Sequence, residues 1–205
     1  MRLLIATHNR GKLVEYQAIF ADLQLDLATL DDVDIHDDVA ETGVTFAENA
    51  RAKAIAYARQ SGLLTLADDS GLQVDALGGE PGIHSKRYAG ANKSDSDRIA
   101  FLLDKLRDVP VGRRAARFRC AIALAAPDGK LWETEGACEG EIAFEPRGEN
   151  GFGYDPIFQV TARGARMAEL STAEKNKVSH RARAAEQARD ILAEMIANES
   201  GERDV

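Results

Sequence analysis

The chain has 205 residues, of which 44% are hydrophobic and 29% charged, a composition typical of a soluble globular protein. At this length a single domain buries about 70% of the surface that its unfolded chain exposes, so one core can form without disulfides or metals. Lys and Arg total 26 and Asp and Glu total 34, which gives a net charge of −8. This charge argues against a nucleic-acid-binding surface spread over the fold.

Cysteine usage and hydropathy indicate the compartment. Cys120 and Cys138 are the only thiols and lack CxxC spacing, which favours a reducing environment. The longest apolar run, residues 120–126, is far shorter than the roughly 18 residues of a membrane span, and the N-terminus has no apolar signal region. We therefore expect a cytoplasmic protein that binds neither membrane nor nucleic acid.

Hydrophobic periodicity divides the chain into alternating strands and helices. The first half predicts a strand at 3–6, a helix at about 13–23, a helix from a capping box at Thr45–Glu48 to Gly62, and a strand at 63–67 that enters a turn at Asp68–Gly71. The second half predicts a helix at 94–106, strands at 116–125 and 131–142 around an Asp128–Gly129 turn, a strand at 157–160, and one long helix from a capping box at Ser171–Glu174.

This order of elements predicts an α/β fold, in which an elongated mixed β-sheet is flanked by helices. We expect one domain over residues 1–205, with residues 201–205 frayed. Four polar segments at the expected ends of strands are candidate ligand sites, because α/β proteins commonly bind ligands there.

The first candidate segment is Thr7–Lys12, between a strand and a helix. Backbone amides, the helix dipole and the Lys12 ammonium would converge on one point, which suits a phosphate chain. The Walker A pattern is absent. The alternative is a polar loop in which Asn9 serves only as a helix N-cap.

The second segment is Asp68-Asp69-Ser70-Gly71, directly after a buried strand. In a turn, both carboxylates could face Mg²⁺, which prefers oxygen ligands, and one could take a proton from water. Glu41 is a candidate third ligand. The alternatives are a turn with solvated aspartates and, around Glu41, a solvated acidic loop.

The third and fourth segments lie in the second half of the chain. Glycines at 148–153 would let the backbone approach a flat ligand such as a nucleobase, with Phe152 stacked on it and Asp155 accepting hydrogen bonds. Lys175, His180 and Arg181 would form an anion or carbonyl-oxygen site. The alternatives are a mobile glycine loop whose aromatics anchor the core, and a charged helix face.

Six collinear motifs join these segments. They are residues 6–12 (ATHNRGK), 41–50 (ETG and FAENA), 67–72 (ADDSGL), 85–90 (SKRYAG), 151–156 (GFGYDP) and 174–181 (EKN to SHR). Together they resemble the inosine triphosphate pyrophosphatase family, the Ham1-type pyrophosphatases of non-canonical purine nucleoside triphosphates. The resemblance runs from Ile5 to about Ala188, and His8 stands where many members have a small residue.

The resemblance implies Mg²⁺-dependent hydrolysis of ITP, dITP and XTP to the monophosphate and pyrophosphate, in a cleft between two lobes of a homodimer. Carried over residue by residue, it implies that Asp69 is the general base and that Glu41 and Asp69 are metal ligands near Asp68. The implied substrate contacts are Thr7, His8, Asn9, Arg10, Gly11, Lys12, Ser70, Phe152, Gly153, Tyr154, Asp155, Lys175, His180 and Arg181. Lys53 and Arg87 stand in family-like stretches, where phosphate contacts are a further expectation.

Two other functions stay open from the sequence. One is a related nucleotide pyrophosphatase with another base preference, and the other is a nucleotide-binding module without turnover. The presence of both Asp68 and Asp69 disfavours the module.

Overall fold

The computed structural model describes residues 1–201, so of the five residues expected to fray, 202–205 lie outside the described part. Its strands are β1 (Arg2–Ile5), β2 (Asp26–Thr29), β3 (Leu64–Val74), β4 (Ala115–Ala125), β5 (Leu131–Ile142), β6 (Phe158–Val160) and β7 (Ala165–Arg166). Its α-helices are α1 (Arg10–Ile19), α2 (Phe46–Ser61), α3 (Asp95–Lys105), α4 (Thr172–Lys175) and α5 (His180–Gly201).

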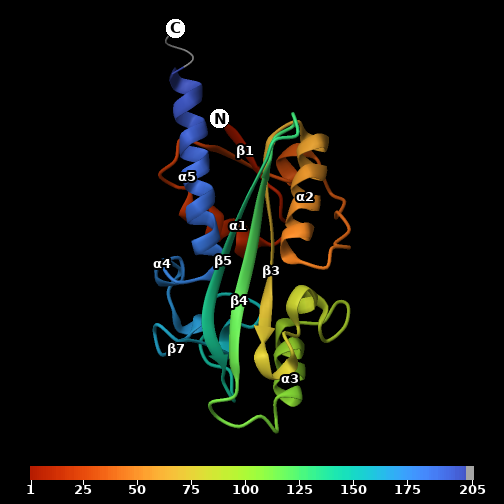
Figure 1. Ribbon diagram of the computed structural model, residues 1–205, viewed down its shortest axis with the longest axis vertical. Helices are drawn as coiled ribbons and strands as arrows, with labels where there is room; N and C mark the ends of the chain where they lie inside the picture. Colours follow the sequence, from red (N-terminus) through yellow and green to blue (C-terminus); the bar gives the residue numbers. More distant parts are fainter. Residues whose placement is uncertain (202–205) are drawn as a thin grey trace. The chain divides into compact units, whose positions relative to one another are not determined.

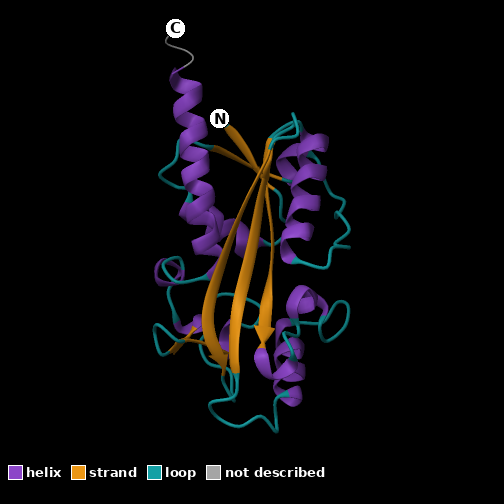
Figure 2. Ribbon diagram, in the orientation of Figure 1, coloured by secondary structure: helices purple, strands orange, loops and turns teal. Residues whose placement is uncertain are grey.

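The seven strands form one sheet in the order β2-β1-β3-β4-β5-β6-β7. Figure 2 shows the strands in orange and the helices in purple. Strand β1 pairs in parallel with both β2 and β3, whereas β6 pairs antiparallel with β5 and β7. The predicted mixed α/β sheet is thus confirmed. The short strands β2 and β7 were not predicted, because two to four residues carry too little periodicity to be recognised.

The chain divides into two compact units. The first contains residues 1–69, 121–136 and the C-terminal residues from 182, and the second contains residues 70–120 and 137–181. In the first unit, β1, β2 and β3 are parallel and connected through α1 and α2, and such crossovers bury a strand on both faces. Leu3, Leu4 and Ile5 are accordingly fully buried.

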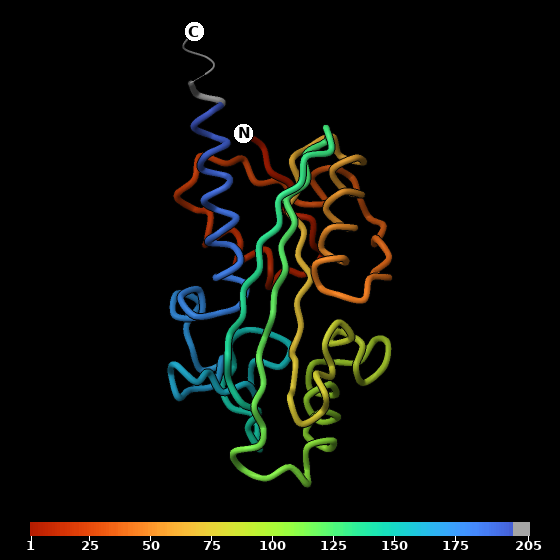
Figure 3. The backbone as a smooth tube through the Cα atoms, in the orientation of Figure 1, coloured from red at the N-terminus to blue at the C-terminus, as the bar shows by residue number. Residues whose placement is uncertain are grey.

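Helices cover the strands of the first unit. Figure 1 shows α2 (orange) and α5 (blue) on either side of the part of β3, β4 and β5 that belongs to this unit. Helix α2 begins at the predicted cap, where Thr45 Oγ1 accepts a hydrogen bond from Glu48 N. The capping box is shifted by one residue, since Glu48 Oε2 accepts from Val44 N. The predicted turn at Asp128–Gly129 is also present, between β4 and β5 (Figure 3).

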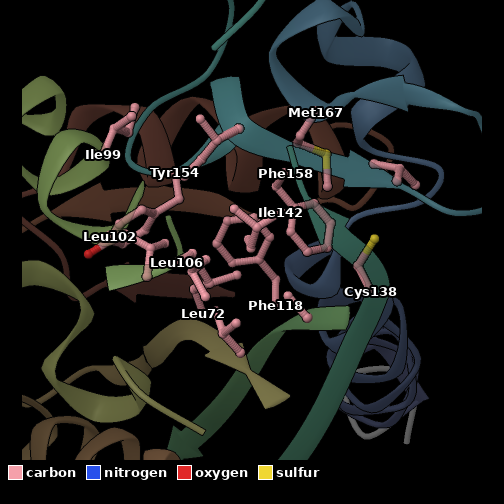
Figure 4. Packing of buried hydrophobic residues seen from close by; sticks show 14 of the residues in the cluster. Leu72, Ile99, Leu102, Leu106, Phe118, Cys138, Ile142, Tyr154, Phe158 and Met167 are labelled. Carbon is pink, nitrogen blue, oxygen red and sulfur yellow. The ribbon is translucent and has the colours of Figure 1, made fainter. Parts of the chain in front are cut away.

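The second unit has its own hydrophobic core (Figure 4). The rings of Phe118 and Phe158 lie 4.5 Å apart at its centre, and Leu102 and Leu106 enter it from the α3 segment. Helix α3 begins at Ser94 with a complete capping box. Together these contacts form a packed scaffold for the loops of this unit.

Two local predictions were wrong. Residues Asp68–Gly71 do not form a turn but continue β3, because both carboxylates have partners on neighbouring helices and tertiary contacts override turn propensity. The helix predicted from Ser171 is two helices. Ser171 does cap α4 with Glu174, but the chain bends after Asn176, and Val178 enters the core before α5 begins.

Candidate active site

The loop after β1 places Lys12 in the first turn of α1. Asn9 is the N-cap of this helix, and its Oδ1 accepts hydrogen bonds from Gly11 N at 2.8 Å and Lys12 N at 3.2 Å. Thr7 Oγ1 accepts from Asn9 N at 3.1 Å. The capping role of Asn9 is therefore confirmed, and His8, Asn9 and Arg10 are exposed to solvent.

Lys12 forms an ion pair with the first of the two adjacent aspartates. Its Nζ lies 2.9 Å from both carboxylate oxygens of Asp68. The Asp68 side chain is only 1% exposed. A buried carboxylate is costly unless it is paired and hydrogen bonded, so the ammonium of Lys12 stabilises Asp68 in its charged form.

Asp69 points to different partners from Asp68, because successive side chains of an extended strand face opposite sides of the sheet. Its Oδ2 accepts a hydrogen bond from Asn49 Nδ2 at 2.9 Å. Burial raises the pKa of Asp69 above its ordinary value, although Lys53 and the hydrogen bond from Asn49 partly oppose this rise. A carboxylate with a raised pKa is a better proton acceptor than a solvated one.

Lys53 of α2 lies between two carboxylates. Its Nζ is 2.7 Å from Glu41 Oε1 and 4.0 Å from Asp69 Oδ1. Burial by itself would lower the pKa of Lys53, but the charges of Asp69, Asp68 and Glu41 outweigh it, so the pKa is raised and the ammonium stays charged. Glu41 is thus part of a charged cluster rather than of a purely solvated acidic loop.

We call Lys12, Glu41, Lys53, Asp68 and Asp69 the carboxylate-lysine cluster. Within residues 1–201, no three His, Cys, Asp or Glu side chains are arranged to hold a metal ion by themselves. Mg²⁺ is usually held by only one or two carboxylates together with substrate phosphates. The pair Glu41 and Asp69 fits this pattern, because the two carboxylates already flank one cation, the Lys53 ammonium.

In the second unit, Ser70 and Arg181 come together. Arg181 Nη2 donates a hydrogen bond to Ser70 Oγ at 2.9 Å, and Arg181 is almost completely buried. The neighbouring residue, His180, stacks its ring on Phe118 at a centroid distance of 4.7 Å. The alternative of a charged, solvated helix face is therefore wrong for these two residues, which occupy interior positions.

The glycine-rich loop is built around the carboxylate of Asp155. Its Oδ2 accepts hydrogen bonds from Lys175 Nζ at 2.6 Å and from Phe152 N at 3.0 Å. Gly151 has a φ of 76°, and a Cβ there would lie 2.1 Å from the same oxygen, so only glycine fits. Gly153 N donates to Asp95 Oδ2 at 2.6 Å, which attaches the loop to α3.

The two aromatic residues of this loop have different surroundings. Tyr154 is a core anchor, since its ring is buried and its hydroxyl donates to Ser85 O at 3.0 Å. Phe152 is only half-buried, and two cations lie near its ring, Lys175 Nζ at 4.8 Å and Arg181 Cζ at 5.5 Å from the centroid. We call Ser70, Phe152, Asp155, Lys175 and Arg181 the Phe152 cluster.

Three residues that bond to candidate residues were not singled out from the sequence. Asn49 and Asp95 bond directly to candidate residues, and Ser85 holds Tyr154, yet none of them was a candidate. Asn49 does lie inside the quoted FAENA motif and Ser85 inside SKRYAG, so the motifs marked the stretches but not the roles. No spacing rule pointed to Asp95. The phosphate role of Arg87 stays a prediction.

Comparisons with known proteins agree with the family resemblance. A family model described as the Ham1 family matches residues 3–191. A protein of Geobacillus kaustophilus named dITP/XTP pyrophosphatase is 53% identical over 182 residues, 89% of each chain, and one of Geobacter sulfurreducens with the same name is 50% identical over 191 residues, 93% of this chain and 96% of that one. A solved HAM1 protein from Coxiella burnetii superposes with a TM-score of 0.86 at 44% identity, covering 95% of this chain and 99% of that chain.

Proposed function

The chain belongs to the Ham1 family, and on this premise we propose that it hydrolyses the non-canonical purine nucleoside triphosphates dITP, ITP and XTP to the nucleoside monophosphate and pyrophosphate. The observation that carries the proposal is the environment of Asp69. Its buried carboxylate is oriented by Asn49, and the cation of Lys53 lies 4.0 Å away. This is the arrangement expected of a general base beside bound phosphates.

In the proposed reaction, Asp69 removes a proton from the water molecule that attacks the α-phosphorus. A bond forms between the water oxygen and phosphorus, and the bond to the oxygen bridging the α- and β-phosphates breaks. Negative charge then collects on the departing pyrophosphate. The positive charge of Lys12 neutralises it. Asp68 holds this ammonium in place beside the first turn of α1.

We propose Mg²⁺ as the cofactor, held by Glu41 and Asp69 together with the substrate phosphates. Bound there, it would supply positive charge to the triphosphate. Because Lys53 lies against the same two carboxylates, its ammonium would contact the phosphates that share this site.

The Phe152 cluster would recognise the purine. The half-buried Phe152 ring offers a stacking surface, and Asp155 fixes Lys175 beside it. Arg181 and His180 would donate to the oxygen at C6 of hypoxanthine or xanthine, whereas adenine presents an amino group there. A buried donor left unpaired costs about 1–3 kcal/mol, a preference of roughly 10- to 100-fold for each contact.

Several implications of the resemblance stay predictions: the cleft between two lobes, the homodimer and the cytoplasmic location. None of the described helices is long and apolar enough to cross a membrane.

The test is to incubate the purified protein with Mg²⁺ and, separately, ITP, XTP, ATP or GTP, and to assay pyrophosphate and orthophosphate as distinct products. The Asp69→Asn variant and a reaction without Mg²⁺ are the controls. Pyrophosphate released chiefly from ITP and XTP supports the proposal. Orthophosphate alone, equal rates for all bases, or tight binding with intact substrate would overturn it, and the last result would favour a binding module.

A further inference from the structure

Asn49 of α2 is a polar side chain in an interior position, only 1% exposed to solvent. Asn is a poor helix former, because its side chain competes for backbone hydrogen bonds. A buried Asn within a helix therefore indicates that its side chain makes specific contacts outside the helix. Here it makes two of them, to Asp69 of β3 and to Gly43 in the segment before α2.

The direction of the amide follows from the nature of its partners. Gly43 N can only donate a hydrogen bond, so the group that faces it at 2.8 Å must be the acceptor Oδ1. The donor Nδ2 then faces Asp69 Oδ2 at 2.9 Å. The Asn49 amide thus connects Asp69 with the segment that carries Glu41, and only this orientation of the amide satisfies both partners.

The contact with Gly43 is close enough to fix the segment that carries Glu41. A Cβ at position 43 would lie 2.8 Å from Asn49 Oδ1 and 2.7 Å from Glu48 Cβ, so this segment packs directly on the first turn of α2. Glu48 Oε2 adds a second attachment by accepting from Val44 N at 2.7 Å. Glu41 lies two residues before Gly43 and is held against Lys53.

We propose that Asn49 is a positioning residue for the reaction, which aligns the carboxylate of Asp69 through Nδ2 and the Glu41 segment through Oδ1. By fixing Oδ2, the amide also fixes the direction of Oδ1, the oxygen on the Lys53 side. This inference rests on the proposed function, in which Asp69 and Glu41 act on the phosphates. A small displacement of such groups lowers turnover strongly, by as much as about 100-fold per ångström.

Two variants separate the two hydrogen bonds. Asn49→Ala removes both of them. Asn49→Asp has the same shape and keeps an acceptor for Gly43 N, but it loses the donor to Asp69 and brings a second negative charge beside Asp69 Oδ2. The matched control is Thr134→Val in β5 of the same unit. Thr134 is 6% exposed, and its hydroxyl donates to Ala184 O of α5 at 2.8 Å, so this variant keeps the shape of the side chain and loses a buried hydrogen bond.

Each protein is compared by its melting temperature, by kcat and KM for ITP, and by calorimetric binding of Mg²⁺ without nucleotide. Both Asn49 variants are expected to lower kcat about 10- to 100-fold while KM changes less than about threefold, because Asn49 contacts the proposed general base, Asp69, and not the substrate. Asn49→Ala is also expected to weaken Mg²⁺ binding. Thr134→Val should lower the melting temperature with kcat within about twofold of wild type.

A merely structural role would make kcat follow the melting temperature in all three variants. The inference is overturned if the folded Asn49 variants keep kcat within about twofold of wild type, or if Thr134→Val reproduces their loss. If the wild type itself hydrolyses neither ITP nor XTP, the proposed function fails. The Mg²⁺ titration then decides the inference, which falls if wild type and Asn49→Ala bind the ion equally or not at all.

Discussion

Replacing Asp155 by Asn would test the electrostatic basis of the Phe152 cluster. The Asp155 and Lys175 side chains are only 4% and 6% exposed, and the atoms Oδ2 and Nζ lie 2.6 Å apart. The same oxygen accepts from Phe152 N at 3.0 Å. Asn keeps the shape of the side chain but removes the negative charge, so the buried ammonium loses this counter-charge.

The expected cost follows from the burial of the pair. Removing one partner of a buried ion pair costs about 3–5 kcal/mol. The amide oxygen of Asn can still accept one hydrogen bond at this position, so we expect the lower end of that range, about 3 kcal/mol. For a chain of this size 1 kcal/mol corresponds to about 2–4 °C, which predicts a melting temperature about 6–12 °C lower.

The assay is thermal and urea unfolding followed by circular dichroism, with Glu145→Gln as the matched control. Glu145 Oε1 and Arg147 Nη2 also lie 2.6 Å apart, but their side chains are 64% and 60% exposed. An exposed pair contributes about 0–1 kcal/mol, so this control should change stability little. If Asp155→Asn is no more destabilising than Glu145→Gln, the argument from burial is wrong. A double-mutant cycle with Lys175→Met must also show coupling, since independent effects would contradict the pairing.

Three further predictions concern other parts of the molecule. Asp69→Asn should remove most turnover with the fold intact. Because burial raises the pKa of Asp69, wild-type kcat/KM should fall with decreasing pH through a value above the ordinary 3.8, and an acid limb at or below 3.8 would contradict this. Because the pKa of Asp69 is higher in the folded than in the unfolded state, its protonation stabilises the fold fully below pH 3.8, and this stabilisation is lost as the pH rises through the raised pKa. The unfolding free energy of Asp69→Asn, measured against pH, should not show this loss. Lys12→Ala should reduce kcat/KM for ITP and destabilise the protein by about 3 kcal/mol, because it removes the counter-charge of the buried Asp68; unchanged values of both would exclude Lys12 from the phosphate site. Gly140→Ala should lower stability by about 1–3 kcal/mol in urea unfolding, because its Cβ would lie 2.4 Å from Gln159 O and 2.5 Å from Phe158 Cζ, and unchanged stability would show that β5 and β6 can separate at no cost.

Local chemistry made much of the fold predictable. The cap at Thr45, the helical period of α3 and the apolar alternation of β4 and β5 are properties of a few neighbouring residues, and these elements lie where they were expected. The turn expected at Asp68–Gly71 failed because its outcome depends on Lys12 and Asn49, which are distant in sequence. Propensity alone contains no information about such partners.

The candidate site shows the same limit. Side chains with distinctive chemistry, such as Asp69, Lys12 and Arg181, could be named from the motifs. Their pairings could not be predicted, because an ion pair such as that of Lys12 with Asp68 spans 56 positions of the chain. Asn49 could not be assigned a role either, since an Asn near a helix start is usually explained by capping. Its role depends on burial and on two partners that only the folded chain brings together.

The correction at β3 also explains how adjacent residues have separate roles. In a turn, Asp68 and Asp69 would compete for one cation, and their like charges would repel each other at close range. In a strand, they face opposite sides, so Asp68 holds Lys12 of α1 while Asp69 faces Asn49 and Lys53 of α2. In the proposed function, extended backbone therefore lets Asp68 stay paired with Lys12, the proposed phosphate ligand, while Asp69, with its raised pKa, is the proposed base. A one-residue insertion in β3 before Asp68 would exchange these two faces and would abolish both arrangements at once.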